Sequence, residues 1–166
     1  MIRLPAVLVA PLGVILAAIN SAHAGEFQIT VTIDLVDRQV RNEETLETPT
    51  TKKPPPRPVA ELTHDQAARV SWRVENTSTS EEFRDVLVHF FVVREEKIGQ
   101  DKVPKLTNDV AYEGALTTDF KPREKADWNW TLNIHEPGNY LLRVETIGML
   151  KKHGHEHYAA LDLIVK

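Results

Sequence analysis

The sequence contains no cysteine. Without cysteine, the chain forms no disulfide, offers no thiolate to a metal ion and has no place for lipid attachment at an amino-terminal cysteine. The hydrophobic core must therefore supply the stability of the fold. The roughly 140 residues that follow the amino-terminal segment are enough to build one such core.

A strong excess of one charge is also lacking. The 20 Lys and Arg residues stand against 24 Asp and Glu residues, which gives a formal net charge of −4. Residues of the two signs are interspersed along the chain. This balance predicts neither a nucleic-acid partner nor attraction to an anionic membrane surface.

No apolar run is long and continuous enough for a comfortable membrane span. The one candidate, Leu4–Ile19, is interrupted by two prolines and a glycine. It follows Arg3 and precedes Ala22-His-Ala24, a pattern typical of a secretory signal peptide over residues 1–24. We expect cleavage after the last of these alanines, export of residues 25–166 to the periplasm or the exterior, and no membrane span in the mature chain.

A second cleavage position would have a chemical consequence. Cleavage after Ala22 would leave His23 at the amino terminus, where its amine and imidazole together can chelate copper. That cut would place Asn20 at a position that prefers a small apolar residue, so the later position is favoured.

Apolar and polar residues alternate with a period of two along most of the remaining chain, and no segment has a convincing helical period. This alternation is typical of strands with one buried face. Residues 86–93 are apolar on both phases, which indicates a central strand with His89 as a hydrogen-bonded core residue. The predicted strands span residues 27–35, 70–74, 86–93, 110–116, 128–134, 140–147 and 158–165.

The stretch at 41–61 interrupts the pattern. A polar run leads there into three consecutive prolines, Pro54–Pro56, followed by Arg57 and Pro58. Prolines cannot donate to a strand ladder, and a run of them favours an extended polyproline conformation. We predict a solvated loop that carries the chain from one sheet to the other.

Two short stretches resemble known strand motifs. Glu136-Pro-Gly-Asn-Tyr-Leu-Leu-Arg-Val144 is similar to the penultimate strand of bacterial immunoglobulin-like and fibronectin-III-like modules, in which the tyrosine hydroxyl bonds back to the backbone at a sheet corner. Val70–Ser78 resembles an early strand and turn of the same group. The resemblance implies one immunoglobulin-like antiparallel β-sandwich of about seven strands over residues 25–166. Such modules serve adhesion, accessory, chaperone and metal-handling roles, so the fold alone selects no function.

Three histidines alternate with other residues near the carboxyl end, at His153, His155 and His157. Residues two apart in an extended chain project to the same side about 7 Å apart, a separation from which two imidazoles can converge on one ion. Three in a straight strand span about 13 Å, too far for one site. Either Gly154 bends the chain, or His155 and His157 form the pair and another element completes the site.

The sequence leaves the completing residue open. The candidates are His153, Met149, Glu156, His64, His89 and His135. Imidazole ligands without thiolates suit Zn²⁺, Cu²⁺ or Ni²⁺, while the neighbouring Lys151 and Lys152 oppose cation binding. A solvated loop that happens to be rich in histidine is the alternative interpretation.

No catalytic motif accompanies these histidines. Neither a carboxylate pair nor a nucleophile, histidine and acid set stands in a motif context. We therefore expect a non-enzymatic binding or accessory module with a protein partner in the cell envelope. The alternative is a periplasmic metal-binding protein that uses the 153–157 segment.

Overall fold

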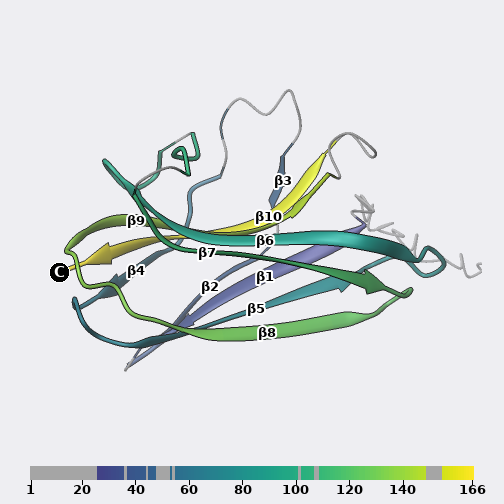
Figure 1. Ribbon diagram of the computed structural model, residues 1–166, viewed down its shortest axis with the longest axis horizontal. Helices are drawn as coiled ribbons and strands as arrows, with labels where there is room; N and C mark the ends of the chain where they lie inside the picture. The colour runs from purple at the N-terminus through teal and green to yellow at the C-terminus, as the bar shows by residue number, and fades with distance from the viewer. Residues whose placement is uncertain are drawn as a thin grey trace, which may run out of the picture.

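The computed structural model describes residues 26–35, 37–43, 45–47 (backbone only), 53, 55–100, 102–106, 109–148 and 155–166. The predicted signal peptide at 1–24 lies outside these residues. The described residues form ten strands and no helix (Figure 1). The described part of the chain accordingly contains no helical membrane span.

The first sheet has four strands, and every neighbouring pair in it is antiparallel. Alternation in the sequence gives each of its longer strands one buried face; in β1 every second residue from Phe27 is buried. The strand order is β2 (Gln39–Glu43), β1 (Phe27–Asp34), β5 (Ala68–Asn76) and β8 (Lys125–Leu132).

The second sheet has six strands. The path through it is β3 (Thr45–Glu47), β10 (Glu156–Val165), β9 (Gly138–Ile147), β6 (Phe83–Glu95) and β7 (Val110–Phe120). The sixth strand, β4 (Val59–Leu62), pairs in parallel with the end of β10, whereas β3 pairs antiparallel with its beginning. The two short strands thus share one edge of β10.

The sheets lie face to face in two layers (Figure 1). Their inward side chains form one large apolar cluster, against which Trp128 and Trp130 also pack, as their phase in the sequence predicts. A smaller cluster, which includes Phe91, Leu141 and Tyr158, lies on the opposite face of the second sheet. Strand β6 contributes side chains to both clusters, which explains why it is apolar on both of its faces.

The all-β prediction is confirmed, and each of the seven predicted strands is present. The predicted count of about seven is wrong, because β2, β3 and β4 were not anticipated. These strands have only five, three and four residues, and β2 is exposed or half-buried throughout. Such short edge strands leave no apolar alternation in the sequence to detect.

The predicted change of sheet within the stretch at 41–61 is confirmed, because β2 belongs to the first sheet and β3 to the second. The prediction of a solvated loop is wrong, because the stretch contains β3 and most of β4. The chain passes from the first sheet to the second between β2 and β3, before the prolines. The stretch then returns to the same edge of β10 through β4. The second change of sheet comes after it, between β4 and β5. Residues 55–58 therefore run beside the second sheet and do not connect the two layers.

Candidate metal centre

Three polar side chains from opposite ends of the chain meet at one end of the sandwich. Glu26 immediately precedes β1 in the first sheet, and His155 and His157 lie at the start of β10 in the second. Strand β1 packs against β10 across the core, so the first described residue and the start of the last strand lie side by side here. We call these three residues the Glu26 cluster.

A single carboxylate oxygen holds both imidazoles. Glu26 Oε2 lies 2.7 Å from His155 Nε2 and 3.2 Å from His157 Nε2. The two rings stand nearly perpendicular, with centroids 4.8 Å apart. A carboxylate only accepts hydrogen bonds, so each ring nitrogen donates in these contacts. The cluster is therefore a hydrogen-bonded set of three side chains with their polar atoms turned inward.

Burial differs among the three. The His157 side chain is fully buried, and its ring meets Phe27 edge to face at 5.8 Å between centroids. The side chains of His155 and Glu26 are 20% and 17% exposed. One imidazole is thus fixed in the core, while the other two groups remain in contact with solvent.

The spacing suits a metal ion. One ligand atom from each residue lies within 4.8 Å of the other two. In a tetrahedral zinc site with metal–ligand distances near 2.1 Å, ligand atoms lie about 3.4 Å apart. The contact of Glu26 with His157, at 3.2 Å, is close to this value, and that with His155, at 2.7 Å, is shorter. His155 is the residue that would move most, and it is partly exposed and precedes the strand. Two imidazoles and one carboxylate form a donor set that accepts Zn²⁺, Cu²⁺ or Ni²⁺.

Of the three predicted histidine ligands, His155 and His157 are brought together, as the alternative with a two-residue pair anticipated. His153 lies outside the described residues. The predicted loop is too long by two residues, because β10 begins at Glu156 and includes His157. Backbone pairing with β3 at this position explains the early start of the strand.

Glu26 was not among the predicted completing residues. The only signal for it is its place one residue before the first alternating strand. That signal gains meaning only when β1 and β10 are known to face each other at this end.

The other candidates lie elsewhere or outside the described residues. Met149 is outside them, and Glu156 alternates with the histidine pair along the strand. His64 Nδ1 contacts the carbonyl of Lys166, and His135 pairs with Asp65. None of these described residues belongs to the Glu26 cluster.

His89 is a hydrogen-bonded core residue, as predicted. Its two ring nitrogens lie 3.2 Å from Glu145 Oε1 and 3.0 Å from Glu113 Oε1. With both nitrogens facing carboxylates, the imidazole connects β6 to its two neighbours, β9 and β7. It therefore stabilises the sheet and contributes nothing to the Glu26 cluster.

A second ionic group lies under the proline-rich stretch. Arg57 donates to Asp162 Oδ1 at 2.6 Å and to Glu95 Oε1 at 3.0 Å, and all three side chains are buried. Burial raises the pKa of the Glu95 carboxyl to about 7; Arg57 opposes the increase and Asp162 adds to it. No pattern in the sequence indicates this arrangement, because Arg57 stands in a stretch predicted to be solvated.

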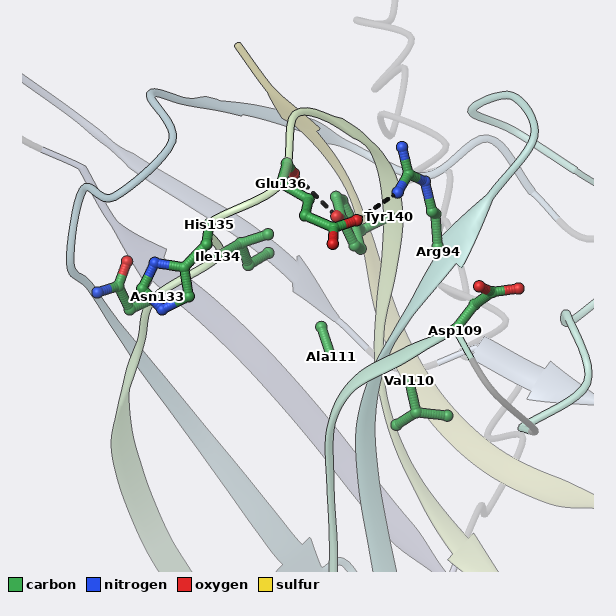
Figure 2. A pocket seen from close by; sticks show the side chains of 9 residues that line it. All are labelled: Arg94, Asp109, Val110, Ala111, Asn133, Ile134, His135, Glu136 and Tyr140. Atoms are coloured by element: carbon green, nitrogen blue, oxygen red, sulfur yellow. Dashed lines mark hydrogen bonds and ion pairs between the residues drawn. The ribbon is translucent and has the colours of Figure 1, made fainter.

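A shallow pocket of about 340 Å³ lies at the other end of the sandwich (Figure 2). Its polar side chains bond mainly to one another: Arg94 Nη1 donates to Glu136 Oε2 at 2.8 Å. The Tyr140 hydroxyl donates to the Glu136 carbonyl at 2.8 Å, which confirms the predicted tyrosine contact at the sheet corner. These contacts brace the turn before β9.

Comparison with known proteins identifies no family. No family model matches the chain, and no curated protein matches it. Among solved structures, the soluble domain of PmoD from Methylocystis sp. ATCC 49242 (Rockwell) has a TM-score of 0.43 at 13% identity, over 83% of this chain and 90% of that one. The C-terminal domain of wzt has a TM-score of 0.41 at 12% identity, over 74% and 70% of the two chains.

A third similar structure is a β-glucosidase from Listeria innocua, with a TM-score of 0.39 at 13% identity. The match covers 77% of this chain and 16% of the glucosidase. At these identities and scores, the similarities supply no argument about function.

Proposed function

We propose that the protein is an exported, non-enzymatic β-sandwich of the immunoglobulin-like type that binds a divalent transition-metal ion through Glu26, His155 and His157. The observation that carries this proposal is the convergence of two imidazoles on one carboxylate oxygen across the two sheets. The signal-peptide pattern in the sequence supports export, and the tyrosine contact at the sheet corner supports the immunoglobulin-like type.

The donor set favours binding over catalysis by this chain. Three protein ligands can hold an ion and leave a position for a further ligand. Phe27, which contacts the His157 ring, adds apolar surface to the cluster. Metal storage, delivery or use as a structural clasp are the roles that such a centre serves.

A direct titration tests the proposal. The exported chain, freed of metal and without a tag, is titrated with Cu²⁺, Zn²⁺ and Ni²⁺ beside a His155→Ala/His157→Ala variant. We expect about one equivalent to bind at micromolar affinity or better, and the double variant to lose this binding. A His64→Ala/His135→Ala variant is the matched control, because it removes two histidines distant from the cluster. Binding that survives the first variant would refute the site.

A second function rests on the free edge of the six-stranded sheet. Strand β7 has eleven residues and, among the described residues, pairs only with β6. An extended segment of a partner protein can add a strand to such an edge. This is the interaction module predicted from the sequence, with a partner in the cell envelope. Recovery of a partner with the exported chain, and slower hydrogen exchange of β7 amides in the complex, would support it.

A further inference from the structure

One hydroxyl in the core has no hydrogen-bond partner in the described part of the chain. Thr146 lies on β9 with its side chain 1% exposed, and its Oγ1 is buried without a partner among the described residues. A buried hydroxyl without a hydrogen bond destabilises the fold, and a valine would fill the same space without that cost. The hydroxyl can therefore still form a hydrogen bond that no described neighbour supplies.

The sheet register places this hydroxyl beside the Glu26 cluster. Strands β9 and β10 are antiparallel, and Glu145 pairs with Tyr158. That pair is the last of the ladder, and continuing its register by one residue would set Thr146 opposite His157. Both side chains are buried on the inner face, and directly opposite residues have Cβ atoms about 5 Å apart. Thr146 is thus the cross-strand neighbour of the most deeply buried ligand in the cluster.

The chemistry of the Glu26 cluster indicates what the Thr146 hydroxyl could bind. Three protein donors leave at least one position on a bound ion for a water molecule or a small anion. Hydrogen bonds from outside the ligand set commonly orient such groups and change metal affinity 10- to 100-fold. We propose that the Thr146 hydroxyl binds and orients the water or small oxygen-donor anion that completes the coordination of the ion. This inference rests on the metal site proposed above.

Substitutions that separate the hydroxyl from the side-chain volume test it. Thr146→Val removes the hydroxyl and keeps the volume, Thr146→Ser does the opposite, and Thr146→Ala removes both. Each chain is titrated with Cu²⁺, the visible absorption of the Cu²⁺ complex is recorded, and the Tm is measured without metal. We expect Thr146→Val to keep or exceed the wild-type Tm, to bind Cu²⁺ about 10-fold more weakly and to shift the absorption band.

The Cu²⁺ affinity and the absorption spectrum of the four chains should depend on whether residue 146 has a hydroxyl. Wild type and Thr146→Ser should share one affinity and spectrum, and the Val and Ala variants should share another. Wild-type affinity and spectrum in Thr146→Val would overturn the role of Thr146 and leave the metal site standing. Affinities that follow side-chain volume instead would also overturn it. Failure of the wild type to bind Cu²⁺ would refute the site itself and this inference with it.

Discussion

Glu26 and His155 are 129 residues apart in the sequence, yet a carboxylate oxygen of one lies 2.7 Å from a ring nitrogen of the other. The contact joins the start of β1 to the start of β10, in different sheets. An ion bound there would be a link between the two layers. Since the unfolded chain holds these ligands far apart, metal binding should stabilise the folded chain.

This linkage predicts a thermal shift. At a metal concentration 100 times the Kd, binding contributes about 2.7 kcal/mol, which corresponds to an increase in Tm of roughly 5–10 °C for a chain of this size. Glu26→Gln removes the charged ligand and should lose most of the increase. Glu43→Gln, which changes an exposed carboxylate on β2, should keep it. Equal shifts in both variants, measured by calorimetry with and without Zn²⁺, would show that Glu26 is not a ligand.

The second prediction concerns Arg57. Its guanidinium lies between two buried carboxylates, so Arg57→Ala would leave Glu95 and Asp162 facing each other without a cation. Breaking a buried ion pair in this way costs about 3–5 kcal/mol. Arg73→Ala removes an arginine from the exposed pair with Asp127 and should cost no more than about 1 kcal/mol. Urea unfolding of both variants measures the difference, and similar losses would contradict the importance of the buried group.

The third prediction is a pH dependence that originates at Glu95. The pKa of this carboxyl is about 7 in the folded chain, compared with an ordinary value of 4.5. Between these two values the folded chain retains a proton that the unfolded chain has lost, so the stabilising contribution is complete below pH 4.5. It declines as the pH rises to about 7, by an amount on the order of 2–3 kcal/mol.

Glu95→Gln isolates this contribution, because the amide does not titrate. Wild type should lose stability relative to Glu95→Gln between pH 5 and pH 8, as measured by urea unfolding at several pH values. If the two chains keep a constant difference in free energy of unfolding across this range, the assignment to Glu95 is wrong.

The long strands were predictable because their burial follows their alternation. Phe27, Ile29 and Val31 are all fully buried, so the alternation of apolar and polar residues in the sequence matches the alternation of burial in the strand. The short strands at the sheet edge have too few core residues for such a pattern: β4 buries only Ala60 and Leu62. Both β3 and β4 pair with the backbone of β10. Backbone pairing is nearly independent of residue type, which explains why these strands were missed.

The two histidines of the candidate site could be predicted from the sequence, and Glu26 could not. The spacing of His155 and His157 is a local property of one strand, and local periodicity was enough to pair them. Glu26 joins them only through the packing of β1 on β10, the first and the last strand of the described chain. No pattern within one segment of sequence carries that information.

Polar residues inside the fold were the least predictable. Asn76 begins a glycosylation triplet in the sequence, but its side chain is fully buried and donates to the carbonyl oxygens of Glu81 and Lys121, each at 2.8 Å. Arg57 is buried in the same way. The environment of such residues depends on which distant backbone and side-chain groups surround them, and residue type alone points to the surface.

The fourth prediction concerns the pairing of Gly114 with Phe90 across β7 and β6. The phenyl ring covers the glycine: a Cβ added at Gly114 would lie 2.4 Å from Phe90 Cζ and 2.7 Å from Cε2. Phe90 cannot easily give way, because its ring packs against Trp72 at 4.7 Å and against Trp130 at 5.5 Å between centroids. The glycine therefore provides the space that the aromatic cluster between the sheets occupies.

Gly114→Ala should destabilise the protein by about 1–3 kcal/mol, the usual cost of forcing extra atoms into a packed core. The direction of the change in the free energy of unfolding is informative, because replacing a glycine by alanine inside a strand normally stabilises the protein by about 0.5–1 kcal/mol. Combining Gly114→Ala with Phe90→Leu should make the glycine substitution much less costly than it is in wild type. Ala115→Ser, at the next and exposed position of β7, is the control for a change on this strand. A neutral or stabilising Gly114→Ala in urea unfolding would show that the ring does not need this space.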